Sequence, residues 1–121
     1  MVYDVSLAVP LYNEEEGADR IIFGLVETFE RYKLNYQLVL VANGCLDKTP
    51  EKIDKWVAKN KRIKKVSVPK NLGYGWGVIN GLNACEAPII GWSDGDDQIY
   101  FEDIVRVYQR MLDKGFDVCK A

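Results

Sequence analysis

Residues 36–44 read YQLVLVANG and carry the clearest sign of the fold class. The run from Tyr36 to Ala42 is almost continuously apolar, which is typical of a strand that is covered on both faces. The Asn43-Gly44 pair that follows signals a turn. Strands of this kind occur mostly in parallel sheets with helices on either side, so the stretch predicts an α/β protein.

Strands and helices are predicted to alternate outward from this stretch. On its N-terminal side, residues 2–10 form a β-branched strand and residues 15–32 an amphipathic helix whose acidic start suits the helix dipole. The apolar face of that helix contains Ile21, Ile22, Leu25, Val26 and Phe29. This helix is therefore expected to connect the first two strands along the chain and to pack its apolar face on the sheet.

The same alternation continues on the C-terminal side. Thr49 is predicted to cap a helix with Pro50 at its first position, and Gly115 to end a later helix. The predicted elements are helices over 49–60, 74–86 and 101–114 and strands over 63–68, 89–93 and 116–120. The order β-α-β-α-β-α-β-α-β predicts one Rossmann-like domain over residues 1–121, with a mostly parallel sheet and helices on both faces.

Composition excludes several classes of protein. The chain has 121 residues, of which 48% are hydrophobic, and its formal net charge is −2, whereas nucleic-acid binders are usually basic. No apolar run approaches the roughly 20 residues of a membrane span, and no secretory signal is recognised at the start. Histidine is absent, which excludes Ser-His-Asp and Cys-His catalysis within this chain. The three cysteines, Cys45, Cys85 and Cys119, match no zinc pattern and are predicted to be reduced, as in the cytoplasm.

Parallel sheets bind ligands outside the carboxyl ends of their strands, where the strand order reverses. The loop after the predicted strand 89–93 is the strongest signal, because Asp94, Asp96 and Asp97 place three carboxylates within four residues. Such a cluster favours a hard cation, Mg²⁺ or Mn²⁺, and Gly95 leaves room for a ligand. A solvated acidic turn before the next helix is the alternative, and the residues alone leave both open.

The loops after the first two strands offer groups that suit a nucleoside. Tyr12 could stack on a base, Glu14 could accept hydrogen bonds from a base or ribose, and Pro10 fixes the exit of the strand. Asn43 carries both a donor and an acceptor. Ordinary turns would explain the same residues, so these loops support a ligand site only in combination.

The loop at residues 71–77, NLGYGWG, only partly resembles a G-x-G-x-x-G phosphate loop. It lacks the third glycine and follows the third strand, and the chain has no G-x-x-x-x-G-K-[ST] motif, so dinucleotide and P-loop sites are excluded. What remains is a backbone around Gly73 that can approach a ligand closely, with the N–H groups of a helix start available to an anion. Lys70 is a candidate phosphate contact, with a solvated lysine as the alternative.

Together these loops resemble the nucleotide-binding half of the family-2 glycosyltransferases, which have the GT-A fold. The resemblance is collinear over the whole chain and is carried by residues 10–14, 42–49, 71–75 with Gly81, and 94–98. Within the family, the chain most resembles the subset that glycosylates polyprenyl phosphates, such as relatives of dolichyl-phosphate mannose synthase. The resemblance implies an inverting transfer of a hexose from a UDP- or GDP-type sugar to an acceptor, either a lipid phosphate or a glycan.

The resemblance also implies roles for individual residues. Pro10, Tyr12 and Glu14 would line the base and ribose pocket, and Asn43 would replace the second of two base-reading aspartates. In the DXD-like motif at residues 94–96, Asp94 would lie near the ribose and sugar, and Asp96 would coordinate the metal ion, beside Gln98. Asp94 and Asp96 are therefore the candidate catalytic residues, and Gly73, Gly95 and Lys70 complete the candidate donor site.

Two departures from the family pattern bear on function. Ala42 and Cys45 stand where the family usually has an aspartate and a serine, which puts base choice or affinity in question. Family catalytic domains also continue past the fifth strand into an acceptor part, so the isolated chain is expected to transfer sugar poorly. A donor-binding fragment or interaction module that pairs through an exposed sheet edge, giving a homodimer, is the alternative. A sugar nucleotidyltransferase is disfavoured because residues 11–17 are acidic rather than basic.

Overall fold

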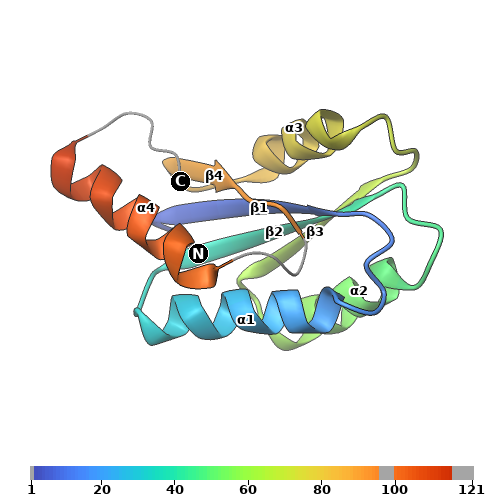
Figure 1. The fold of residues 1–121 in the computed structure, drawn as a ribbon, viewed down its shortest axis with the longest axis horizontal. Coiled ribbons are helices and arrows are strands. Elements are labelled where there is room, and N and C mark those ends of the chain that lie inside the picture. The colour runs from blue at the N-terminus through green and yellow to red at the C-terminus, as the bar shows by residue number, and fades with distance from the viewer. Residues whose placement is uncertain (1, 96–99, 116–121) are drawn as a thin grey trace.

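A computed structural model describes residues 2–95 and 100–115 of the chain. Within these ranges, four parallel strands form one sheet in the order β3-β2-β1-β4, and helices cover both of its faces (Figure 1). The α/β architecture predicted from the sequence is confirmed. The predicted strand over 116–120 and the residues Asp96, Asp97 and Gln98 lie outside the described ranges.

The elements follow the predicted alternation. In chain order they are β1 (Val5–Leu11), α1 (Ala18–Arg31), β2 (Tyr36–Asn43), α2 (Thr49–Lys59), β3 (Ile63–Val68), α3 (Tyr74–Ala84), β4 (Ile89–Trp92) and α4 (Phe101–Lys114). The prediction that α1 starts at residue 15 was wrong, because the N–H groups of Gly17 and Ala18 both donate to the Glu14 carbonyl in a turn before the helix. The prediction that α3 runs to residue 86 was also wrong, because Cys85 has extended dihedral angles.

The predicted N-cap of α2 was wrong as well. Lys48 occupies the cap position and Thr49 is the first helical residue, so Pro50 is the second helical residue and not the predicted first one. The Asp47 Oδ1 atom accepts hydrogen bonds from the Thr49 amide at 2.9 Å and from the Thr49 hydroxyl at 2.6 Å. Asp47, two residues before Thr49, therefore holds the start of this helix, and the oxygen of the threonine hydroxyl can still accept a hydrogen bond from elsewhere.

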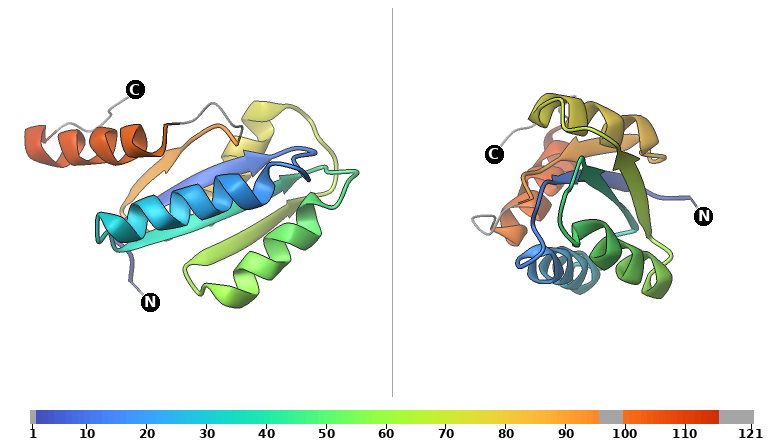
Figure 2. Two further views of the ribbon diagram at one scale, coloured as in Figure 1. Left: turned by 60° about the horizontal axis from the view of Figure 1, so that its bottom comes forward. Right: turned by 90° about the vertical axis from the view of Figure 1, so that its right-hand side faces the viewer.

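The helices form a layer on each side of the sheet. α1 and α2 cover one face and α3 covers the other, while α4 lies against the α1 side near the amino ends of the strands (Figures 1 and 2). The main core fills the α1 side, where β1 residues Leu7, Val9 and Leu11 pack with α1 residues including Ile21 and Leu25. Every residue of β2 is buried, as its apolar run predicted.

On the other face, α3 lies very close to the strands. A Cβ atom added at Gly81 would lie 2.8 Å from both Ala8 Cβ and Val41 Cγ2. Real Cβ atoms do not approach other atoms so closely, so the helix backbone rests directly on β1 and β2 at this point. The glycines of α3 therefore permit the tight contact and also bring the start of the helix to the carboxyl edge of the sheet.

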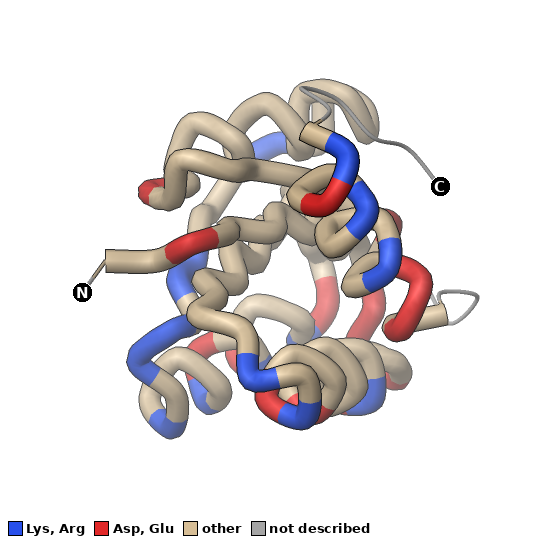
Figure 3. The backbone as a smooth tube through the Cα atoms, turned by 90° about the vertical axis from the view of Figure 1, so that its left-hand side faces the viewer, with Lys and Arg blue, Asp and Glu red and all other residues tan. Residues whose placement is uncertain are grey.

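Over the described residues, the structure agrees with two exclusions made from composition, those of a basic nucleic-acid binder and of a membrane span. Lys and Arg segments are scattered among Asp and Glu segments over the visible tube and do not gather on one side (Figure 3). No helix in the two described ranges combines the length and apolar character required to cross a membrane.

Candidate functional site

The strand order reverses between β1 and β4, so the carboxyl ends of these strands flank the switch point where α/β sheets bind ligands. The Ser93 amide donates to the Ala8 carbonyl at 3.1 Å, which extends the pairing to the end of β4. A Cβ atom at Gly95 would lie 2.5 Å from the Pro10 carbonyl oxygen and would clash with Leu11. Only glycine fits there, and Asp94 consequently leaves β4 as an exposed residue beside the exit of β1.

Asn43 ends β2 and is the central polar residue of this edge. Its side chain is 2% exposed, and its Nδ2 atom donates to the Gly73 carbonyl at 3.4 Å. Its Oδ1 atom is buried and has no hydrogen-bond partner among the described residues. A buried acceptor without a donor costs free energy, so this atom is suited to receive a donor from a ligand.

Glycines let the backbone approach Asn43 from α3. A Cβ atom at Gly77 would lie 2.7 Å from Asn43 Nδ2 and 3.3 Å from Pro10 Cβ. Gly73, just before α3, has a φ angle of 111°, and its amide donates to Asn71 Oδ1 at 2.7 Å. Asn43 therefore lies between the end of β1 and the start of α3, where the sequence predicted a nucleoside site.

The loop after β2 also contacts the loop after β3. Gly44 has a φ angle of 65°, and its amide donates to the Val68 carbonyl at 2.8 Å. A Cβ atom at Gly44 would clash with the backbone of Asn71 and lie 2.9 Å from the carbonyl carbon of Lys70. The side chain of Lys70 is exposed on the rim of this edge, where a lysine can meet a phosphate or solvent.

The loop after β1 is joined to the loop after β2 by side-chain hydrogen bonds. Asn13 has a φ angle of 49° and accepts from the Leu46 amide at 2.8 Å. The Glu14 amide donates to Thr49 Oγ1 at 2.9 Å, and the Glu15 amide donates to Asp47 Oδ2 at 3.1 Å. Sequence analysis missed these links, although an aspartate two residues before Thr-Pro is a recognisable helix-start signal.

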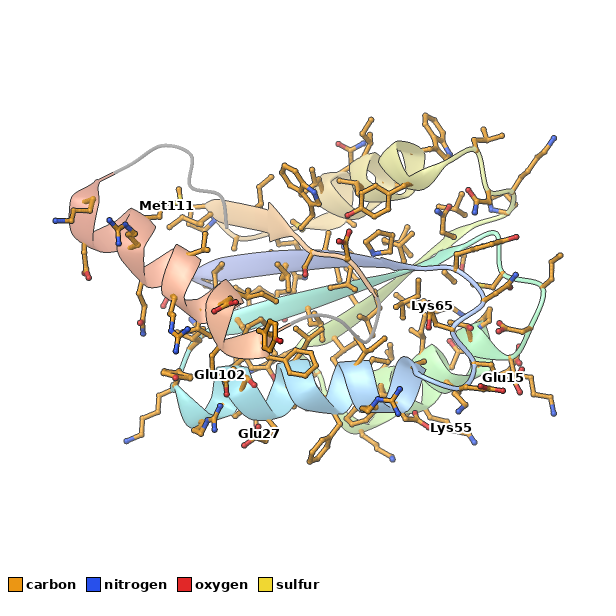
Figure 4. The ribbon with its side chains drawn as sticks, in the orientation of Figure 1. Glu15, Glu27, Lys55, Lys65, Glu102 and Met111 are labelled. Carbon is orange, nitrogen blue, oxygen red and sulfur yellow. The ribbon has the colours of Figure 1, made fainter. Side chains whose placement is uncertain are left out.

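Two labelled glutamates show where the hydrogen-bonded loops after β1 and β2 lie in the molecule. Glu15 is at the end of the molecule that holds the carboxyl ends of the strands, whereas Glu102 lies on α4 (Figure 4). Glu15 accepts from the Lys48 amide at 3.0 Å, and Glu102 pairs with Arg31 of α1 at 2.7 Å. The Glu15 contact therefore belongs to the candidate site, while the Glu102 ion pair fastens α4 to α1 away from it.

The structure brings most of the predicted donor-binding positions to one edge. Pro10 is buried, Glu14 is partly buried, and Tyr12 has a 47% exposed side chain at the same loop. Asn43, Gly73, Asp94 and Gly95 lie at the ends of neighbouring elements. The roles assigned to these residues, and to Asp96 and Gln98 outside the described ranges, remain predictions.

A metal site was also predicted at this edge of the sheet. Within residues 2–95 and 100–115, no group of three or more His, Cys, Asp or Glu residues could hold a metal ion. Asp94 is the described member of the acidic loop, and its carboxylate oxygens are the hard donors that Mg²⁺ and Mn²⁺ prefer. The predicted metal ligands, Asp96 and Gln98, lie outside the described ranges, so their role stays a prediction.

The family is settled by comparison with protein-family models. The model described as glycosyl transferase family 2 matches residues 6–121. This chain belongs to glycosyl transferase family 2. The family-2 resemblance predicted from the four loops is thereby confirmed over nearly the whole chain.

Relatives of this family-2 chain agree in sequence and in fold. An undecaprenyl-phosphate 4-deoxy-4-formamido-L-arabinose transferase from Proteus mirabilis is 24% identical over 94% of this chain and 35% of that protein. The crystal structure of S. aureus TarS in complex with UDP has a TM-score of 0.73 at 22% identity, covering 91% of this chain and 32% of that one.

A second solved structure shares the fold. The mannosyltransferase PcManGT from Pyrobaculum calidifontis, in complex with GDP-Man and Mn²⁺, has a TM-score of 0.67 at 20% identity, covering 79% of this chain and 28% of that one. The GT-A fold predicted for this chain is therefore confirmed. The chain spans about a third of the length of the curated relatives it matches first.

Proposed function

We propose that this family-2 glycosyltransferase chain binds a nucleoside-diphosphate sugar at the carboxyl edge of its sheet. The proposed reaction transfers a hexose from that donor to an acceptor oxygen, with inversion at the anomeric carbon. The donor part of the proposal is supported by two solved structures of the same fold, one in complex with UDP and the other in complex with GDP-Man and Mn²⁺.

The unpartnered Oδ1 atom of Asn43 is the single observation that carries the donor proposal. One Nδ2 hydrogen is directed to the Gly73 carbonyl, whereas Oδ1 has no donor among the described residues and is the group left for a donor on the ligand. Uracil and guanine each carry a ring N–H that could donate to Oδ1, whereas the corresponding ring nitrogen of cytosine is an acceptor and the donor on that base is its exocyclic amino group. The site is therefore expected to prefer UDP- or GDP-type donors to CDP-type donors.

The acidic loop would serve the diphosphate. In this proposal Asp94 lies near the ribose and sugar, and Asp96 and Gln98 hold Mg²⁺ or Mn²⁺. A bound divalent ion would neutralise the charge that develops on the departing nucleoside diphosphate. Asp94 and Asp96 are thus the proposed catalytic residues, and Lys70 and the backbone at Gly73 lie on the proposed phosphate side.

A polyprenyl phosphate is the proposed acceptor class. The transferase from Proteus mirabilis is named for undecaprenyl phosphate, and a phosphate oxygen is already anionic near neutral pH. Such an acceptor needs no general base, whereas a sugar hydroxyl would need one. A cytoplasmic location, at the inner face of a membrane, belongs to the same proposal and agrees with the free thiols of Cys45 and Cys85.

Calorimetric titration tests the donor site. The wild-type chain is titrated with UDP, GDP and CDP, with and without Mn²⁺, and we expect UDP or GDP to bind at least about tenfold more tightly than CDP, or about 1.4 kcal/mol. Asn43→Ala should weaken the preferred nucleotide by a similar factor, while Asn83→Ala, an exposed position on α3, should not. Asp96→Ala should remove the effect of Mn²⁺.

Three results would count against parts of the proposal. Failure of the wild-type chain to bind any of the three nucleotides would reject the donor site itself. Equal binding of CDP would reject the role of Asn43, and an unchanged Mn²⁺ effect in Asp96→Ala would reject the metal assignment. Transfer of sugar by the isolated chain is expected to be weak.

The alternative proposal is a donor-binding fragment or interaction module that works with a partner. It is favoured by β4, which is an edge among the described strands and exposes Ile90 and Trp92. Nucleotide binding without transfer, together with self-association, would support this alternative.

A further inference from the structure

We propose that Asp47 and Thr49 are positioning residues, which hold the loop after β1 in the conformation that presents Tyr12 and Glu14 to the nucleotide. We call the hydrogen-bonded set of Asn13, Glu14, Glu15, Leu46, Asp47, Lys48 and Thr49 the loop clasp. The inference rests on the proposed function, because it assigns these residues to the same nucleotide site without giving them contact with the ligand.

Thr49 is the link between the two loops. Its hydroxyl donates to Asp47 Oδ1 at 2.6 Å and accepts from the Glu14 amide at 2.9 Å, and the residue is fully buried. A hydroxyl has one hydrogen to donate, so this arrangement fixes its direction. The direction of the hydroxyl then determines where the Glu14 amide lies.

Asp47 holds the next amide along the chain. Its Oδ1 atom is occupied by Thr49, and its Oδ2 atom accepts from the Glu15 amide at 3.1 Å. Hydrogen bonds to a carboxylate are stronger than those between neutral groups. The start of α2 therefore fixes two consecutive amides of the loop after β1, which lies more than 30 residues away in sequence.

The loop after β1 needs such external support. α1 begins only at Ala18, so Glu14 and Glu15 precede the helix and their amides take no part in its hydrogen-bond ladder. Asn13 is in the left-handed region, and its side chain is fixed to the Leu46 amide. Uncommon backbone conformations persist where the surroundings hold them, which is the case at this loop.

Release of the loop clasp should weaken nucleotide binding more than it weakens the fold. Tyr12 and Glu14 lie within or directly beside the clasped residues, whereas the main core is built by β1, β2 and α1. A loop without the clasp must be ordered when the nucleotide binds, and the conformational entropy lost in that ordering weakens binding. Ordering one residue corresponds to about a tenfold loss of affinity.

The test compares variants that remove or restore the Thr49 hydroxyl. Thr49→Val keeps the shape of the side chain without the hydroxyl, Thr49→Ser keeps the hydroxyl, and Asp54→Ala is a matched control that removes an exposed ion pair of α2 with Lys65. The dissociation constant is measured by calorimetry for whichever of UDP and GDP binds the wild-type chain more tightly. Urea unfolding and amide hydrogen exchange of Glu14 and Glu15 are measured on the same samples.

We expect Thr49→Val to bind about tenfold more weakly, with faster exchange at Glu14 and Glu15 and little change at the amides of β2. Thr49→Ser and Asp54→Ala should bind within about twofold of wild type. If Thr49→Val does not fold, Asp47→Asn takes its place, because it retains an acceptor for Thr49 while weakening the hold on Glu15.

The outcomes separate this inference from the proposed function. Nucleotide binding by Thr49→Val within twofold of wild type, or equal weakening by Thr49→Ser, would overturn the positioning role alone. A wild-type chain that binds neither UDP nor GDP would overturn the proposed function and this role with it.

Discussion

At the scale of single residues, Asp47 makes the free energy of unfolding depend on pH. Burial raises the pKa of Asp47, but hydrogen bonds from the Thr49 hydroxyl and amide and from the Glu15 amide outweigh burial and hold the pKa below its ordinary value. The folded state therefore binds a proton less readily than the unfolded state. The stability that Asp47 contributes is present above the ordinary aspartate pKa of about 3.9 and is lost as pH falls through the lower folded-state value.

This linkage predicts the acid response of Asp47→Asn. The wild-type chain should be more stable than the variant at pH 6, and the difference should shrink as the pH approaches about 3, because wild type alone loses the Asp47 contribution. Urea unfolding at several pH values measures the difference. Asp19 and Glu102, whose pKa values are also lowered, are present in both proteins and do not affect the comparison. Parallel pH dependence of the two proteins would contradict the prediction.

Cys85 gives a second prediction for a single side chain. Burial raises the pKa of the Cys85 thiol to about 11, although Ser6 and Lys64 act in the opposite direction. Because the thiolate is the reactive form, alkylation by iodoacetamide at pH 8 should be about a hundredfold slower than that of free cysteine, whose pKa is about 8.5. Mass spectrometry of the peptide that contains Cys85 follows the reaction. Labelling as fast as free cysteine would show that the thiol is not protected.

At the scale of elements, the contact of α3 with the sheet depends on glycine. Gly81→Ala would place a methyl group 2.8 Å from both Ala8 and Val41, whose strands cannot retreat, so we expect a loss of about 1–3 kcal/mol in the free energy of unfolding. Gly75→Ala in the same helix meets no atom within 4 Å and should instead gain up to about 1 kcal/mol from helix propensity. Urea unfolding of both variants measures the contrast, and equal stabilities would contradict this account of the α3 contact.

The elements also show what can be predicted from sequence. β3 and α4 have the predicted bounds, because β-branched residues mark the strand and Gly115, in the left-handed region, ends the helix. The start of α1 was misplaced because an acidic run suits the helix dipole both before and inside a helix.

Contacts between distant loops were beyond sequence reasoning. The alternation of strands and helices placed the candidate loops at one edge, and the structure confirms that position. The partner of the Thr49 hydroxyl is an amide 35 residues away, which no local pattern reveals. The unpartnered oxygen of Asn43 likewise depends on how closely Gly77 and Pro10 approach it in space.

At the scale of the whole molecule, the two edges of the described sheet differ in character. β3 carries Lys64 and Lys65, and charged side chains discourage an edge strand from pairing with another chain. β4 carries no charge, and its Ile90 and Trp92 side chains are 48% and 58% exposed. If a second copy pairs with the described sheet, as in the alternative proposal, β4 is the expected site; the strand predicted over 116–120, which the sequence also suggests as an edge, lies outside the described ranges.

Ile90→Lys tests this expectation. Light scattering of the wild-type chain should show a mass that rises toward that of a dimer with increasing concentration, and the added charge should abolish the rise by making edge pairing unfavourable. Ile79→Lys is the matched control, because Ile79 is 52% exposed on a helix, α3, and offers no strand edge, so its replacement should leave edge pairing unchanged. A wild-type chain that stays monomeric, or an equal effect of both substitutions, would mean that β4 does not pair with a second copy.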